Sequence, residues 1–152
     1  MAGTPTIASA GVNGATAVDA AKHRLLYIED DRASLTLVEV LIARRSNILL
    51  LSASDSVTGL ATARAILPGV ILMELNLPGM SGTEARRILA DDPRTAHIPV
   101  IAISGNALPR DRQQGLADGF FRYLTKPIRI NELMDTLELA LACAKGTLGA
   151  PP

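Results

Sequence analysis

The chain is poor in aromatic residues, cysteine and net charge, and each shortage argues against a class of function. Aromatic residues make up 3% of its 152 residues, none is tryptophan, and 48% are hydrophobic, so we expect an aliphatic core. The single cysteine, Cys143, excludes a disulfide framework and a thiolate metal site within the chain, and we expect it to be buried on a helix. A formal net charge of zero provides no basic surplus for nucleic acid.

Long apolar runs are also missing. The apolar segments have the length of strands, far short of the roughly 20 residues of a transmembrane helix, and no signal-peptide pattern opens the chain. We therefore expect a cytoplasmic protein that makes no membrane contact. Residues 1–22, rich in Ala, Gly, Thr and Ser, are predicted to be a flexible leader or linker. Residues 23–145 are predicted to form one domain, and residues 146–152 a disordered tail.

Strand-like and helix-like segments alternate between these two ends. The strand-like runs cover residues 25–28, 48–51, 70–74, 100–103 and 120–125. The pattern predicts an α/β fold with a five-stranded parallel sheet and five helices, (βα)5, covered on both faces. The strands are apolar at nearly every position, as strands buried on both faces are.

Capping residues and apolar spacing predict where the helices lie. Asp31 and Asp55 are predicted to start two helices, Ser81 to Glu84 form a capping-box pattern, and Pro109 suits the first turn of a fourth helix. Three further sets of apolar residues are predicted to face the core: Leu35, Val38, Leu41 and Ile42; Val57, Leu60 and Ala61; and Ile130, Leu133, Met134, Leu137 and Leu141.

Four of the predicted strands run into residues that can do chemistry. Glu29 and Asp30 follow the first strand, Glu74 ends the third, Ser104 follows the fourth and Lys126 follows the fifth. In an open parallel sheet the carboxyl ends of the strands share one edge, where such folds bind ligands. We therefore expect these side chains to converge into one site.

Each of these residues has a plain alternative role. The acidic triplet 29–31 alone is best explained as the start of a helix, where acids favour the positive end of the dipole. Together with Glu74 it favours a site for Mg²⁺, which takes carboxylate and carbonyl oxygens. Ser104 can cap a helix or donate to a phosphoryl oxygen. Lys126 can be a surface lysine or can neutralise a phosphate, and its bond to Pro127 can be cis.

These segments resemble the receiver domain of two-component response regulators. The resemblance rests on residues 26–30, 72–82, 98–107 and 123–128 and spans about residues 24–144. It implies a flavodoxin-like, CheY-like doubly wound sheet and a magnesium-dependent phosphoryl site. By position it implies these roles: Mg²⁺ binding by Glu29, Asp30 and Glu74 with the backbone carbonyl of Asn76, switching by Ser104 and Tyr123, and pairing of Lys126 with phosphoryl oxygens.

The chain departs from this pattern at the phosphoacceptor, where the family has Asp and this chain has Glu74. The added methylene moves the carboxylate by about a bond length and a half, and a misplacement of about 1 Å can cost on the order of 100-fold in rate. The longer side chain is expected to contact Lys126 and Ser104 and to imitate a phosphorylated acceptor in part. Three origins stay open: an engineered phosphomimetic, a natural phosphorylation-independent receiver, and a slow acceptor.

The resemblance implies a signalling protein that is not an enzyme. Its partners would be a histidine kinase or histidine phosphotransfer domain and a downstream protein effector, with a homodimer possible and no direct DNA binding. It would be a stand-alone regulator or the terminal receiver of a hybrid kinase. The main alternative is a Mg²⁺-dependent phosphohydrolase with a strand-end carboxylate. A flavodoxin-like cofactor binder is disfavoured, because the acids at 29–31 would repel a phosphate.

Overall fold

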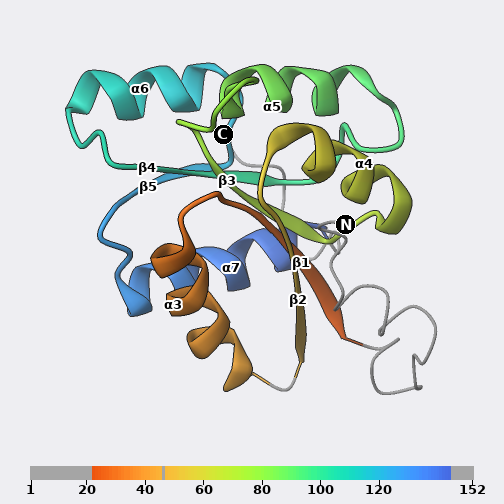
Figure 1. The fold of residues 1–152 in the computed structure, drawn as a ribbon, viewed down its shortest axis with the longest axis vertical. Helices are drawn as coiled ribbons and strands as arrows, with labels where there is room; N and C mark the ends of the chain where they lie inside the picture. The colour runs from red at the N-terminus through yellow and green to blue at the C-terminus, as the bar shows by residue number, and fades with distance from the viewer. Residues whose placement is uncertain (1–21, 46, 145–152) are drawn as a thin grey trace.

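The computed structural model describes residues 22–45 and 47–144, which form a five-stranded sheet with helices on both faces (Figure 1). The elements in chain order are β1 (His23–Ile28), α3 (Arg32–Ala43), β2 (Ile48–Ala53), α4 (Ser56–Ile66), β3 (Val70–Glu74), α5 (Gly82–Asp91), β4 (Val100–Ser104), α6 (Pro109–Ala117), β5 (Arg122–Thr125) and α7 (Ile130–Ala144). The strand order is β2-β1-β3-β4-β5, and all four pairs are parallel. The predicted α/β class and the alternation are confirmed.

The predicted leader and tail fall almost entirely beyond this part of the chain. Of residues 1–22 the structure describes Lys22, and residues 146–152 lie outside the described range. Among the helices that the structure describes, none is both long and apolar enough to cross a bilayer.

Each face of the sheet has its own aliphatic core. Helices α4, α5 and α6 lie on one face, and α3 and α7 lie on the other (Figure 1). On the first face Ile28 and Met73 pack with Leu89, and on the second Leu25 packs with Val38. Successive residues of a strand point to opposite faces, so a strand buried on both faces is apolar throughout, as the sequence predicted.

The predicted helix starts are confirmed by their caps. Asp31 accepts a hydrogen bond from the Ser34 amide at 2.9 Å, and Asp55 caps α4 in the same way. Ser81 and Glu84 form a reciprocal capping box at the start of α5. Pro109 is the first residue of α6, whose N-cap makes no side-chain hydrogen bond.

The buried face predicted for α4 is wrong at two of its three positions. Leu60 is buried, but Val57 is 69% exposed and Ala61 is exposed as well. The residues that face the sheet beside Leu60 are Gly59 and Ala63. Small residues carry most of this contact, and small residues give little apolar signal in a sequence.

Four strand boundaries and one burial prediction also need correction. β1 begins at His23, two residues before the predicted start. β2 extends to Ala53, two residues beyond the predicted end, and β4 includes Ser104. β5 begins at Arg122, so residues 120–121 precede the strand although they are buried. Cys143 lies on α7 but is only half-buried.

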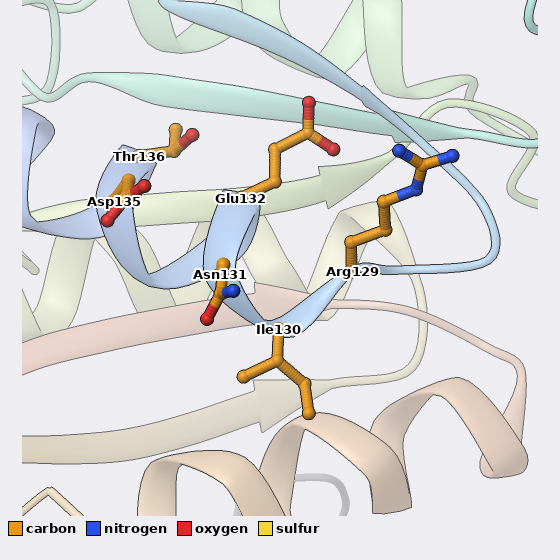
Figure 2. Close-up of a pocket in the computed structure, with 6 residues that line it drawn as sticks. All are labelled: Arg129, Ile130, Asn131, Glu132, Asp135 and Thr136. Atoms are coloured by element: carbon orange, nitrogen blue, oxygen red, sulfur yellow. The ribbon is translucent and has the colours of Figure 1, made fainter.

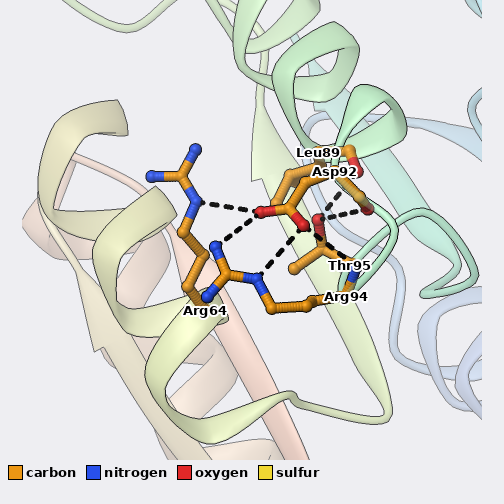
Figure 3. Close-up of polar contacts among 5 residues, drawn as sticks. All are labelled: Arg64, Leu89, Asp92, Arg94 and Thr95. Carbon is orange, nitrogen blue, oxygen red and sulfur yellow. Dashed lines mark hydrogen bonds and ion pairs between the residues drawn. The ribbon is translucent and has the colours of Figure 1, made fainter.

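Asp92, the C-cap of α5, pairs with Arg64 of α4 and with Arg94 in its own loop (Figure 3). Its carboxylate lies 3.3 Å from Arg64 Nε and 3.0 Å from Arg94 Nη2. Hydrogen bonds from Arg94 are the main cause that lowers the pKa of Asp92 to about 2, with Arg64 adding to them. The carboxylate is therefore more acidic in the folded chain than in the unfolded chain.

We expect this contact to shape acid stability. A lowered folded-state pKa stabilises the fold above the ordinary Asp pKa of about 3.9, and that contribution is lost as the pH falls through about 2. Asp92→Asn should therefore lower stability at neutral pH and flatten its decline between about pH 4 and pH 2. Urea unfolding at a series of pH values measures this. Asp91→Asn, at an exposed neighbouring position, is the control and should leave the acid profile unchanged.

Candidate functional site

The carboxyl ends of four strands bring the predicted chemical residues to one edge of the sheet. Glu29 follows β1, Glu74 is the last residue of β3, Ser104 is the last residue of β4, and Lys126 follows β5. The parallel register aligns these ends: Glu74 pairs with Ile103, and the Lys126 amide donates to the Ser104 carbonyl at 2.8 Å. The convergence expected from the sequence is present in the fold.

The centre of the site is an ion-pair bridge in which Lys126 lies between two carboxylates. Lys126 Nζ is 3.0 Å from Glu29 Oε1 and 2.5 Å from Glu74 Oε1. The Glu29 and Glu74 side chains are 0% and 6% exposed, whereas that of Lys126 is 25% exposed. The peptide bond between Lys126 and Pro127 is cis. The contact expected between Glu74 and Lys126 is therefore observed, and both acids are close to fully desolvated.

The second oxygen of each glutamate is held by the backbone. The Asp31 amide donates to Glu29 Oε2 at 3.2 Å, and the Asn76 amide donates to Glu74 Oε2 at 2.9 Å. Both acids are thus fixed in direction by the backbone while they share the single positive charge of Lys126.

Tyr27 is a member of this site that the sequence reading did not identify. Its hydroxyl donates to Glu29 Oε1 at 2.7 Å, and its side chain is completely buried. Burial raises the pKa of Tyr27, and the hydrogen bond to Glu29 raises it further, so the hydroxyl stays protonated and acts as a donor. The available signal was spacing, because residues 27 and 29 point to the same side of an extended strand.

The charge of Lys126 is stable across the ordinary pH range. Burial lowers the pKa of this ammonium, but hydrogen bonds to Glu74 and Glu29 outweigh that effect, and the pKa lies above its usual value. Lys126 therefore keeps its positive charge in the bridge at neutral pH.

Ser104 and Tyr123 are connected through one loop residue. The backbone amide of Asn106 donates to Ser104 Oγ at 3.1 Å, and the Tyr123 hydroxyl donates to the backbone carbonyl of Asn106 at 3.0 Å. Ser104 is completely buried and Tyr123 is 6% exposed. No hydrogen bond joins Ser104 to Glu74 within residues 22–45 and 47–144, where the Ser104 hydroxyl is paired with Asn106 instead.

The two remaining predicted residues, Asp30 and Asn76, are exposed at the mouth of the site. The loop that carries Asn76 folds back closely, because Gly82 lies against the backbone of β3. A Cβ atom at Gly82 would come within 2.5 Å of the Glu74 carbonyl oxygen, so a larger residue would push the loop away. The start of α5 therefore packs against the end of β3.

A surface pocket at the start of α7 lies outside this site (Figure 2). It is lined by Arg129, Ile130, Asn131, Glu132, Asp135 and Thr136, none of which contributes to the bridge. Ile130 is 52% exposed, which corrects its predicted core position, and Figure 2 shows it pointing toward α3 on the opposite side from Glu132. Ile130 is the first residue of α7, and the helix reaches the core at Leu133.

Comparison with known sequences identifies the family. The response regulator receiver domain matches residues 25–138, which include every residue of the bridge. The chain belongs to the response regulator receiver family. Receiver domains are two-component signalling domains and are generally not enzymes, so the family gives the alternative phosphohydrolase no support.

Individual relatives differ in how much of their length this receiver domain covers. It is 42% identical over 106 residues to the response regulator PleD of Caulobacter vibrioides, but it spans only 23% of that protein. It is 31% identical to the protein PilH of Pseudomonas aeruginosa, covering 78% of this chain and 98% of PilH. The polar-differentiation response regulator DivK of Brucella anthropi is also 31% identical, and 97% of it is covered.

Solved structures agree with the fold of this receiver domain. The receiver domain of the sensor histidine kinase PA1611 from Pseudomonas aeruginosa superposes with a TM-score of 0.73 at 27% identity, covering 80% of this chain and 99% of that one. That structure is described as having a magnesium ion coordinated in its active-site cleft. The chemotaxis response regulator CheY4 of Vibrio cholerae, with a TM-score of 0.72 at 23% identity, supports the fold alone.

Proposed function

We propose that this receiver domain signals through protein contacts and takes up a phosphoryl group poorly or not at all, because its acceptor position holds Glu74. The observation that carries the proposal is the 2.5 Å contact between Glu74 Oε1 and Lys126 Nζ. In the role that the family implies, Lys126 pairs with phosphoryl oxygens. Here the longer carboxylate already engages that ammonium, with no phosphoryl group needed.

The contact also argues for a partial imitation of the phosphorylated state. Glu74 supplies one negative charge to Lys126, whereas a phosphoryl group brings about −1.5 to −2 and three acceptor oxygens. Ser104 makes its hydrogen bond with Asn106 and none with Glu74 within the described chain. We therefore assign Lys126 as the group that senses charge at position 74, and Ser104 and Tyr123 as the switch residues that the imitation leaves incompletely engaged.

We also propose that Mg²⁺ binds at this edge through the oxygens of Glu29, Asp30, Glu74 and the Asn76 carbonyl. A carboxylate offers about four lone-pair sites. Glu29 accepts from Tyr27, Asp31 and Lys126, and Glu74 accepts from Lys126 and Asn76, so each retains accepting capacity. Within residues 22–45 and 47–144 no group of three or more His, Cys, Asp or Glu side chains is arranged as a metal site. The three acids of the proposed set would therefore have to come closer together to hold the ion with the Asn76 carbonyl. The ion would supply charge neutralisation for phosphoryl oxygens.

Asp30→Asn is expected to weaken Mg²⁺ binding. A ligand that binds only the folded state at ten times its Kd stabilises the fold by about 1.4 kcal/mol, so Mg²⁺ should raise the melting temperature of the parent and raise that of Asp30→Asn much less. Tyrosine fluorescence is a second measurement, because one of the two tyrosines, Tyr27, donates to Glu29. Asp91→Asn, away from the strand ends, should respond like the parent. An unchanged melting temperature in millimolar Mg²⁺ for parent and variant alike counts against the metal site.

The partners follow from the family role. We propose a histidine kinase or histidine phosphotransfer domain upstream and a protein effector downstream, in the cytoplasm, with a homodimer as one possible assembly. PilH and DivK are matched over nearly their whole length, while the PA1611 receiver belongs to a sensor kinase. Both a stand-alone regulator and the receiver of a hybrid kinase are thus consistent with these relatives.

The experiment that tests the proposal is phosphoryl labelling of the chain beside its Glu74→Asp variant, with Mg²⁺ and a small acyl phosphate as donor. The variant restores the length of an aspartate acceptor and changes nothing else in the site.

A further inference from the structure

Gly115 of α6 lies directly against the ring of Tyr123. It is the residue of α6 that is buried, and α6 packs on β5, which carries Tyr123. A Cβ atom at Gly115 would lie 2.5 Å from Cδ2 and 3.1 Å from Cε2 of the ring. Side-chain carbons do not approach that closely, and Cδ2 is near the base of the ring, where a small rotation gives little relief. The present position of the ring therefore requires glycine at 115.

With the ring in the position that Gly115 permits, the Tyr123 hydroxyl contacts the loop that follows β4. The ring of Tyr123 is buried, and its hydroxyl donates to the Asn106 carbonyl. The amide of the same Asn106 donates to Ser104 Oγ. One loop residue thus carries both the hydrogen bond that holds the tyrosine inward and the hydrogen bond that holds the serine hydroxyl.

Helix formation does not explain this glycine. Glycine in a helix interior is less favourable than alanine, and α6 already begins without a side-chain cap at Leu108. A residue that weakens an already weak helix is accounted for here by the space that it leaves for the ring.

We infer that Gly115 is a positioning residue that keeps Tyr123 buried and bound to Asn106 in the unphosphorylated chain, with a side chain at 115 driving the ring outward. The inference rests on the proposed function only in treating Tyr123 and Ser104 as switch residues. The inward position of Tyr123 is then determined by α6 as well as by the charge at position 74. Gly115→Ala then releases the Asn106 carbonyl from its tyrosine donor and loosens the loop that partners Ser104.

The test uses the fact that the chain has two tyrosines, Tyr27 and Tyr123. Labelling with 3-fluorotyrosine gives two fluorine signals, which Tyr27→Phe and Tyr123→Phe assign. In Gly115→Ala the Tyr123 signal should move toward the shift of the free amino acid and gain a solvent isotope shift, while the Tyr27 signal stays in place. Gln113→Ala, at an exposed position of the same helix, should move neither signal. A Tyr123 signal that stays buried in folded Gly115→Ala overturns the inference.

A double-mutant cycle keeps the inference testable if Gly115→Ala folds poorly. In the parent, Gly115→Ala should increase the equilibrium constant of unfolding, because the new methyl group clashes with the Tyr123 ring. With Tyr123→Ala the ring is gone, and the better helix propensity of alanine should then decrease the constant by about fivefold. The same sign in both backgrounds contradicts the inference. These measurements use the unphosphorylated protein, so their outcome does not depend on whether Glu74→Asp is labelled.

Discussion

Glu74→Asp is expected to convert a chain that takes up little or no phosphoryl label into one that is labelled readily. In the labelling step a carboxylate oxygen attacks the phosphorus of an acyl phosphate, the bond from phosphorus to the donor's carboxylate oxygen breaks, and the donor leaves as a carboxylate. Shortening the side chain by one methylene withdraws the carboxylate from the Lys126 contact at 2.5 Å. It leaves the ammonium available to the incoming phosphoryl oxygens.

The expected gain is on the order of 100-fold or more in initial labelling rate, because a misplacement of about 1 Å at a reacting centre has effects of that size. The gain is measured by intact-protein mass, which rises by one phosphoryl group. Loss of the label in alkali, as expected for an acyl phosphate, is a second measurement. Glu74→Gln is the matched control, since it keeps the length of glutamate and removes the nucleophile, and it should remain unlabelled. Equal labelling of the parent and of Glu74→Asp would contradict the proposal that Glu74 is a poor acceptor because of its length.

The hydrophobic pattern and the alternation of strands and helices were sufficient to predict much of this site. Apolar runs with chemical residues at their ends predicted both the parallel sheet and the convergence of Glu29, Glu74 and Lys126, because topology alone brings strand ends together. The hydrophobic pattern did not predict which carboxylate oxygen each hydrogen-bond donor contacts. The Glu74 carboxylate could have extended to Ser104 as well as to Lys126, and the choice depends on side-chain rotamers that a sequence does not display.

The features that the sequence reading missed are those in which an apolar-looking residue has a polar or steric role. Tyr27 belongs to an apolar run in the sequence, yet its hydroxyl donates to Glu29 at 2.7 Å. Gly115 has no side chain to give a signal in the sequence, and its contact with Tyr123 depends on how α6 packs on β5. Val57 looked like a core residue because it is apolar, yet the phase of α4 turns Gly59 toward the sheet instead. Packing geometry decides each of these cases.

Lys126→Met is expected to produce the largest loss of stability of any single substitution in the site. Methionine keeps a long apolar stem and removes the ammonium, which leaves the Glu29 and Glu74 side chains, 0% and 6% exposed, facing each other without a counter-charge. Removing one partner of a buried ion pair typically costs about 3–5 kcal/mol, and we expect about 3 because Lys126 is partly exposed. The melting temperature should fall by roughly 10 °C for a domain of this size. Urea unfolding at neutral pH without divalent metal measures the change.

The pH dependence of this loss has a defined sign. The pKa of Lys126 lies above its usual value, so the bridge contributes fully below that usual value and weakens only as the pH rises through the raised one. The gap in stability between parent and Lys126→Met should therefore be constant from neutral pH to about pH 10 and close in stronger alkali.

Two further variants separate charge from packing in this prediction. Adding Glu74→Gln to Lys126→Met leaves a single buried carboxylate, on Glu29, which still accepts from Tyr27 and from a backbone amide, and most of the lost stability should return. Arg112→Met is the matched control, because Arg112 is a half-buried cation whose contact is with the Thr125 hydroxyl at 3.4 Å. It should change the free energy of unfolding by no more than about 0.5 kcal/mol. If Lys126→Met costs no more than Arg112→Met, then the bridge between Glu29 and Glu74 does not stabilise this fold, and the carboxylate at position 74 has another partner in solution.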